Sequence, residues 1–213
     1  RYTTSHPSDM DEELIKAHGE VGALMPYLHL PVQSGDDDVL KSMNRKYTGE
    51  SYKTIIEKLR TVCPDIALSS DFIVGFPGES DKAFDKTIKL VKEINFSQAY
   101  SFKYSRRPGT PGSIMKGQVS EKIKSKRLLA LQKILNDQQL FFNMSFLNSK
   151  LEVLLERKGK YKNQLLGRSP YMQAIHVTDP SIALGQFIDV TIAEATKNSL
   201  RGNLIAINKR GMN

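Results

Sequence analysis

The sequence has 213 residues but only one cysteine, no tryptophan and no long apolar run. A single cysteine excludes an internal disulfide and any metal site built from several thiolates. This residue, Cys63, precedes Pro64 at the end of a helical pattern, and we interpret it as a small buried hydrophobe. No apolar run approaches the ~20 residues of a membrane-spanning helix, and the segment after Arg1 lacks the apolar core of a signal peptide. These absences favour a cytoplasmic, reducing compartment.

Basic residues outnumber acidic ones, and the excess is concentrated near the end of the chain. The formal net charge is +8. Residues 144–213 contain ten Lys or Arg against five Asp or Glu. Such a local excess favours a polyanionic partner, and nucleic acid in particular, over an ordinary solvated surface.

The first two thirds of the chain alternate between strand-like and helix-like segments. Strands are predicted over 2–5, 27–32, 66–74 and 99–104, and helices over 11–18, 36–43, 50–62 and 81–94. Strands that alternate with helices of about ten residues or more are typical of βαβ units and a parallel sheet. Polar and glycine-rich turns follow these strands, which is where α/β sheets and barrels carry their binding loops.

A long helix is predicted from about residue 120 to 143, because leucines and isoleucines recur there at helical spacing. Ser120 is a suitable N-cap for this helix. We interpret its basic residues as a solvated face, namely Lys122, Lys124, Lys126 and Arg127.

After residue 146 the pattern changes to five short β-prone runs, at 150–157, 164–168, 172–177, 186–194 and 200–207. Five strands in about sixty residues, separated by Gly, Pro, Asn and Asp, predict a small five-stranded antiparallel β-barrel similar to the OB-fold, a common scaffold for oligonucleotide binding. We therefore divide the chain into an α/β domain over 1–143 and a barrel over 144–213.

Three loop motifs contain candidate binding residues. They lie at 29–35 (HLPVQSG, with MNR at 43–45), at 71–79 (DFIVGFPGE) and at 104–111 (YSRRPGTP). Gln33 and Ser34 have the chemistry to hydrogen-bond a ribose or an amino-acid group, and Arg107 can pair with a carboxylate or phosphate. Gly75 lets the backbone approach a flat ligand closely. Each feature alone is equally typical of an ordinary tight connection.

In this order and spacing, the three motifs resemble the radical S-adenosylmethionine (SAM) methylthiotransferases. The resemblance is strongest to the bacterial branch that adds a methylthio group to C2 of isopentenylated adenosine next to the tRNA anticodon. Residues 144–213 resemble the TRAM domain of that family, a barrel taken to bind tRNA. The resemblance implies a partial (β/α) TIM-like radical SAM barrel followed by the small OB-like barrel.

The resemblance also implies a transferase reaction with S-adenosyl-L-methionine and two [4Fe–4S] clusters as cofactors and tRNA as partner. Clusters need cysteine thiolates, and the family's three-cysteine loop would lie before Arg1. We therefore expect this segment to supply no catalytic residue and no metal ligand, and to be inactive alone. We expect a monomer.

Particular residues of this sequence fall on the family's binding positions. The resemblance implies SAM contacts from Gln33, Ser34, Ile73, Gly75 and Arg107. Asp71 replaces the first glycine of the family's adenine-binding motif and Glu79 comes one residue late, so neither receives a role from it. We interpret His6 and His29 as structural.

In the barrel, candidate phosphate contacts are Arg157, Lys158, Lys160, Lys162, Arg168 and Arg201. Tyr161 and Tyr171 are available for base stacking, although Tyr171 follows Pro170 and is equally suited to anchor a turn.

Two other functions compete with the methylthiotransferase. The missing cysteines favour a non-catalytic RNA-binding protein with a degenerate α/β half-barrel, whereas the intact loop motifs favour the enzyme. An ordinary TIM-barrel enzyme with a phosphate site explains the loops but not the basic tail.

Overall fold

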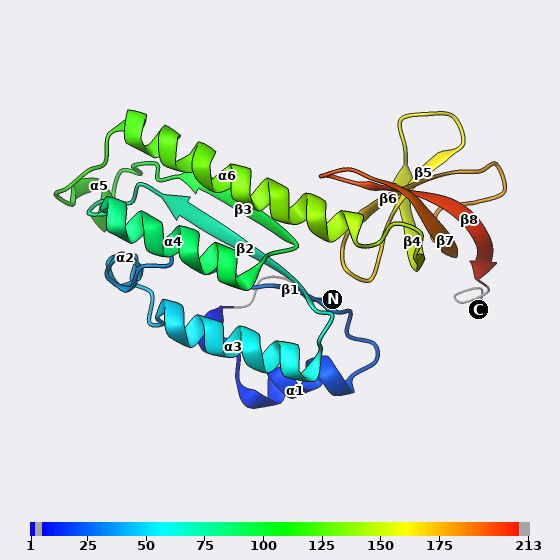
Figure 1. The fold of residues 1–213 in the computed structure, drawn as a ribbon, viewed down its shortest axis with the longest axis horizontal. Helices are drawn as coiled ribbons and strands as arrows, with labels where there is room; N and C mark the ends of the chain where they lie inside the picture. Colours follow the sequence, from blue (N-terminus) through cyan, green and yellow to red (C-terminus); the bar gives the residue numbers. More distant parts are fainter. Residues whose placement is uncertain (3–5, 209–213) are drawn as a thin grey trace. The chain divides into compact units, whose positions relative to one another are not determined.

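A computed structural model describes residues 1–2 and 6–208 of the chain (Figure 1). The chain forms two compact units, Arg1–Gln138 and Gln139–Asn213, and each has its own hydrophobic core. The strand predicted over 2–5 falls on residues 3–5, which lie outside the described part. Within the described ranges, no helix combines the length and apolar character needed to cross a membrane.

The first unit contains a parallel sheet, as the alternating pattern predicts. Its strands are β1 (Tyr27–His29), β2 (Ala67–Val74) and β3 (Gln98–Lys103), in the order β1-β2-β3. β1 is shorter than predicted. Pro31 has no N–H to donate to a ladder, and Gln33 adopts a left-handed φ of 71° and keeps only an isolated bridge to Phe72. The chain therefore leaves the sheet within the first loop motif, after His29.

Helices connect the strands. They are α1 (Glu12–Glu20), α2 (Asp37–Ser42), α3 (Gly49–Val62), α4 (Asp81–Ile94), α5 (Pro111–Ile114) and α6 (Glu121–Met144), with a 3-10 turn at Pro7–Asp9. Five of them begin at a side-chain N-cap that accepts a backbone N–H, namely Asp11, Asp36, Thr48, Ser80 and, as predicted, Ser120. The predicted helices are all present. α5 and the 3-10 turn were not predicted, because elements this short show no apolar periodicity.

The two faces of the sheet differ in character. On one face Leu28, Leu68 and Phe72 are buried in a core that also takes apolar residues from α3, α4 and α6. Register partners in neighbouring strands point to the same face, and the opposite face carries the pairs His29–Ser69 and Asp71–Tyr100. Polar and aromatic side chains therefore collect on the face away from the helices.

The second unit is a closed five-stranded barrel, which confirms the predicted architecture. Its strands are β4 (Lys150–Lys158), β5 (Gln164–Arg168), β6 (Ala174–Thr178), β7 (Phe187–Ala195) and β8 (Leu200–Asn208), in the order β4-β5-β6-β8-β7. The prediction of a wholly antiparallel barrel needs one correction, because β6 and β8 pair in parallel. Strand directions can alternate around a closed ring only if the number of strands is even, so a ring of five must contain a parallel pair.

The end of α6 is bonded to the barrel within this second unit. The Asn143 side-chain amide donates hydrogen bonds to the carbonyls of Thr196 (2.8 Å) and Lys197 (2.9 Å). Its oxygen accepts one from the Gln173 side chain at 3.0 Å. These bonds satisfy a buried polar side chain and fix the last turn of the helix against the β7–β8 connection.

Candidate functional site

A cavity of about 800 Å³ opens where the three parallel strands end. Its lining comes from the ends of β2 and β3 and from the connections that follow the three strands. It includes Gln33, Met43, Asn44, Arg45, Ile73, Phe76, Phe102, Lys103 and Arg107. The carboxyl ends of parallel strands are the usual ligand position in α/β folds. The volume lies within the range of about 300–1,000 Å³ typical of small-molecule sites.

Two predicted site residues, Gln33 and Ile73, meet in the wall of this cavity. The Gln33 N–H donates to the Asp71 carbonyl at 2.9 Å, and the Ile73 N–H donates to the Gln33 carbonyl at 3.0 Å. These two bonds hold Gln33 in its left-handed backbone conformation, which residues with a side chain rarely adopt. The first loop motif therefore presents Gln33 to the cavity from a fixed position on the rim of β2.

The third predicted residue at the cavity is Arg107, whose side chain is exposed and lines its wall. Its loop is closed by the Thr110 hydroxyl, which donates to the Arg107 carbonyl at 2.7 Å. Asn44 and Arg45, which the sequence analysis placed with the first motif but gave no role, line the cavity from the loop after α2. Asn44 has a left-handed φ of 58°. The MNR run at 43–45 was the available signal, because Asn often marks a left-handed turn.

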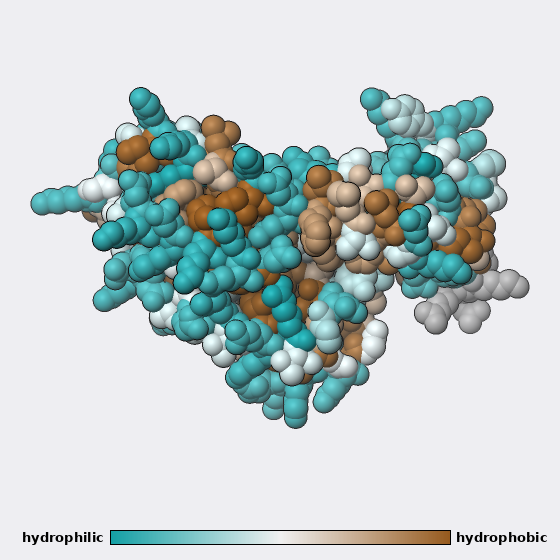
Figure 2. All heavy atoms as spheres, in the orientation of Figure 1, coloured by the Kyte–Doolittle hydropathy of each residue, from teal (hydrophilic) through white to brown (hydrophobic). Residues whose placement is uncertain are grey.

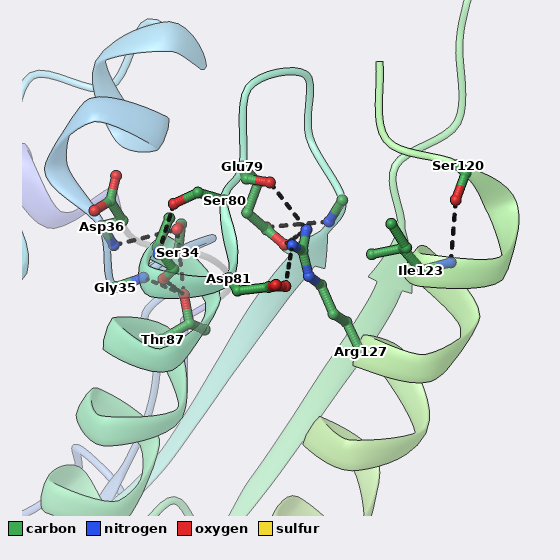
Figure 3. A network of polar contacts seen from close by, with 12 residues as sticks. Ser34, Gly35, Asp36, Glu79, Ser80, Asp81, Thr87, Ser120, Ile123 and Arg127 are labelled. Carbon is green, nitrogen blue, oxygen red and sulfur yellow. Dashed lines mark hydrogen bonds and ion pairs between the residues drawn. The ribbon is translucent and has the colours of Figure 1, made fainter. Parts of the chain in front are cut away.

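Ser34 lies outside the cavity lining and belongs instead to a buried polar network against α4 (Figure 3). Its hydroxyl is 3.3 Å from that of Thr87 and accepts the Asp36 N–H at 3.2 Å. The Gly35 N–H donates to the Thr87 hydroxyl at 2.9 Å. In this structure Ser34 therefore ties the first loop motif to α4.

Gly75 also makes a structural contact. Its φ is +73°, and a Cβ at this position would lie 2.3 Å from Cγ of Lys124. Lys124 is buried, and its ammonium donates to the Tyr104 carbonyl at 3.1 Å. The interpretation of Lys124 as part of a solvated face is therefore wrong. Gly75 leaves room for a lysine stem from α6, so a close ligand approach is not needed to explain this glycine.

A buried ion pair closes the loop after β2 (Figure 3). Arg127 is only 6% exposed and Glu79 only 5%. The guanidinium lies 2.8 Å from the Glu79 carboxylate, donates to the Glu79 carbonyl at 3.0 Å and reaches the Asp81 carboxylate at 2.8 Å. Burial raises the pKa of Glu79, while the Gly75 N–H and the Arg127 charge act in the opposite direction.

The interpretation of Arg127 as part of a solvated face is also wrong, because its side chain is buried and paired with Glu79. The Arg127 contacts join α6 to the Gly-Phe-Pro-Gly loop and so position one wall of the cavity. Sequence reasoning assigned neither Glu79 nor Arg127 a role. In the folded chain the Glu79 carboxylate accepts the Gly75 N–H at 3.1 Å, a contact that the spacing of four residues alone does not predict.

On the sheet face away from the helices, His29 is held by three neighbours. Its Nδ1 lies 3.0 Å from the Ser69 hydroxyl, its Nε2 lies 3.6 Å from the Asp71 carboxylate, and its ring is 6.4 Å from that of Tyr100. His6 accepts the Ser8 N–H at the start of the 3-10 turn. Both histidines make the structural contacts that we expected of them.

Among the described residues, no group of three or more His, Cys, Asp or Glu side chains could hold a metal ion. Cys63 is half-buried at the C-cap of α3, packs against the core, and has its thiol pKa raised by burial. One such thiol does not fit an iron–sulfur cluster.

The predicted RNA contacts of the barrel form two groups. Arg157 and Lys158 end β4, and Lys160 and Lys162 follow in the exposed β4–β5 loop, where hydrophilic side chains dominate (Figure 2, upper right). Across the described barrel, no ion pair involves these four. Arg168 and Arg201 are different, because Arg168 lies 3.8 Å from Glu156 and Arg201 lies 2.7 Å from Glu194.

The two candidate stacking residues, Tyr161 and Tyr171, have different surroundings. Tyr161 is 66% exposed, and the Lys160 ammonium lies 5.8 Å from its ring centroid. Tyr171 packs against Phe146 and Phe142, with ring centroids 5.0 and 6.3 Å away. Of the two interpretations of Tyr171, the structure favours the turn anchor, and Tyr161 remains the residue available to a base.

Comparison with known families defines the class of both units. Residues 1–91 match the family model of the Radical SAM superfamily, and residues 145–205 match that of the TRAM domain. The chain therefore contains part of a radical SAM domain followed by a TRAM domain, which confirms the resemblance drawn from its motifs.

Two curated relatives show which type of radical SAM protein the chain is similar to. The chain is 54% identical over 204 residues to the tRNA-2-methylthio-N(6)-dimethylallyladenosine synthase of Maricaulis maris (strain MCS10), covering 96% of this chain and 45% of the relative. It is 55% identical over 204 residues to the synthase of the same name from Wolbachia sp. subsp. Brugia malayi (strain TRS), covering 95% and 46%. The chain spans about half the length of the curated relatives it matches.

Among solved structures, a radical S-adenosylmethionine methyltransferase from Kitasatospora setae aligns with 53% of this chain and 22% of its own, at 18% identity. The TM-score of 0.43 is too low to support an argument from that likeness.

Proposed function

We propose that this chain is part of a tRNA methylthiotransferase, which adds a methylthio group to C2 of isopentenylated adenosine next to the anticodon. The observation that carries this proposal is the identity of 54% to a named synthase over nearly the whole chain. The order of a radical SAM segment and a TRAM domain supports it. TRAM similarity begins at residue 145, which supports functional domains of 1–143 and 144–213.

We propose that the cavity binds SAM, which when bound supplies the radical and the methyl group. Ile73, Phe76 and Phe102 offer an apolar wall suited to an adenine ring, and Gln33 offers an amide for polar contacts. Arg107 can pair with the amino-acid carboxylate. Ser34 and Gly75 act in this proposal by holding the loops that bound the cavity.

The two [4Fe–4S] clusters of such an enzyme need thiolates that this chain does not contain. We therefore assign no cluster ligand and no catalytic residue to this segment. Its contribution is to bind SAM and RNA. The basic β4–β5 region, with Tyr161 beside it, supports tRNA as the partner of the barrel. We propose that the protein acts as a monomer in the cytoplasm, which contains the tRNA pool.

A chimeric enzyme tests the proposal. The matching half of the Maricaulis maris synthase is replaced by this chain and expressed in a bacterial strain that lacks its own synthase. Mass spectrometry of tRNA nucleosides should then show the methylthiolated, isopentenylated adenosine. A chimera that is folded and binds tRNA, but leaves only isopentenyladenosine, would support the non-catalytic RNA-binding alternative instead.

A further inference from the structure

A row of side chains crosses the outer surface of the barrel in register. Arg157 of β4 pairs with Leu166 of β5, Leu166 with His176 of β6, and His176 with Arg201 of β8. Ile175, next to His176, points into the barrel core, so the row lies on the outside. With strands about 4.8 Å apart, the path around the closed barrel from Arg157 through β5 and β6 to Arg201 is about 14 Å long.

The row has an excess of positive charge. Arg157 is exposed and has no ion-pair partner in the described part of the barrel. Arg201 lies 2.7 Å from the Glu194 carboxylate of β7 and donates to the Asn203 side chain at 3.1 Å. Next to the row, Arg168 lies 3.8 Å from Glu156. The row and the residues beside it therefore carry three arginines and two carboxylates, and each carboxylate already has an arginine partner.

His176 lies between the two arginines of the row and has an unusual environment. Its Nδ1 is buried and has no hydrogen-bond partner within the described residues. Burial, and then the charge of Arg157, lower the pKa of this histidine. Both effects favour the neutral ring in the free protein. Because Nδ1 is buried, any contact between His176 and a phosphate falls to the other ring nitrogen, Nε2.

We propose that this row is a contact surface for RNA phosphates, and that His176 takes up a proton from solvent when RNA occupies it. The inference rests on the RNA-binding part of the proposed function. A phosphate over the row adds negative charge beside His176 and offsets the repulsion from Arg157. The imidazolium can then donate a charge-assisted hydrogen bond, which is stronger than a neutral one.

The coupling between RNA binding and proton uptake by His176 sets the direction of the pH effect. The pKa of His176 lies below its ordinary value in the free protein, and bound phosphate would raise it. Between those two values the complex binds more protons than the free protein, so RNA affinity rises as pH falls. Each unit of difference between the two pKa values corresponds to about a tenfold gain in affinity.

The test uses the whole 213-residue chain and an anticodon stem–loop RNA. Fluorescence anisotropy gives the dissociation constant between pH 5 and 8 at fixed ionic strength. The unsubstituted chain should bind roughly tenfold more tightly at the acidic end, and His176→Gln should remove that gain. Arg157→Ala should weaken binding at pH 8 and flatten the pH dependence, because the free His176 is then easier to protonate.

Lys150→Ala is the matched control. It removes the same charge from the same strand, but about 23 Å from Arg157 along β4, and it should keep the full pH dependence. Protonation of the RNA affects every variant equally. The ring signal of His176 in NMR provides an independent reading, and its titration should move to higher pH when RNA is added.

Two failures can be told apart. If the unsubstituted chain and His176→Gln bind RNA with the same pH dependence, or the ring titration does not move, the inference is overturned while RNA binding stands. If the chain binds no RNA at any pH, the RNA-binding part of the proposed function falls with it.

Discussion

The buried pair of Glu79 and Arg127 allows a quantitative prediction about stability. In Arg127→Ala, the Glu79 carboxylate keeps only the Gly75 N–H at 3.1 Å as a partner in a site that is 5% exposed. Removing one member of a buried ion pair leaves an uncompensated charge and typically costs roughly 3–5 kcal/mol. We expect the free energy of unfolding of the α/β unit to fall by that amount near pH 7.

A double variant separates the charge from the packing. Glu79→Gln with Arg127→Met removes both charges and keeps similar volumes, so it should be more stable than Arg127→Ala alone. Asp81→Asn serves as the matched control, because the Asp81 side chain is 94% exposed and contacts the same guanidinium. We expect that substitution to change stability little.

The assay is urea unfolding of the whole chain followed by far-ultraviolet circular dichroism, with an aromatic signal to separate the two units. The pH dependence adds a second check. In Arg127→Ala the pKa of Glu79 should rise further, so the lost stability should be regained as pH falls and the carboxylate becomes protonated. A loss below about 1 kcal/mol at pH 7 would refute the argument that this pair holds the loop.

Other substitutions test the two sites. The triple Lys158→Ala, Lys160→Ala and Lys162→Ala variant should weaken RNA binding and reduce the slope of log affinity against log salt by about 2, since each contact contributes roughly 0.7. Lys150→Ala should have little effect, and an unchanged slope in the triple variant would remove those lysines from the interface. Gly75→Ala should destabilise the α/β unit by roughly 1–3 kcal/mol and more than Gly78→Ala, because only Gly75 adds a clash with Lys124 to its left-handed backbone. Arg107→Ala should weaken SAM binding at least about tenfold in isothermal titration if a carboxylate pairs there, and equal affinity would argue against that pairing.

Local patterns in the sequence predicted most of the fold. α4 was predicted with its observed bounds, because Ser80 caps it and its apolar stripe is regular. The parallel pairing of β6 and β8 was not predicted, since the direction in which a barrel closes is a property of the whole ring. Lys124 and Arg127 were misjudged for a related reason. Glu79, the partner that makes the burial of Arg127 tolerable, lies 48 residues away in the chain.

The candidate sites were predicted in part. Gln33, Ile73 and Arg107 come together because strand ends of a parallel sheet meet at one edge, which sequence alone can indicate. Ser34 was expected at the same place, but adjacent residues in a turn point in different directions. His176 escaped notice because its surroundings come from three strands, and the register that brings Arg157 and Arg201 beside it is visible only in the folded barrel.

The parallel pairing in the barrel has a consequence for how the domain opens. β6 and β8 share three register pairs, Ile175 to Val177 with Leu200 to Gly202, whereas β7 and β8 share eight. The short β6–β8 pairing closes the ring, and it is the place where the fewest hydrogen bonds must break for the barrel to open. His176 and Arg201 are one of its three pairs. An RNA strand that contacts both would span the β6–β8 pairing from outside, so the bound barrel should exchange the amide hydrogens of β6 and β8 more slowly than the free one.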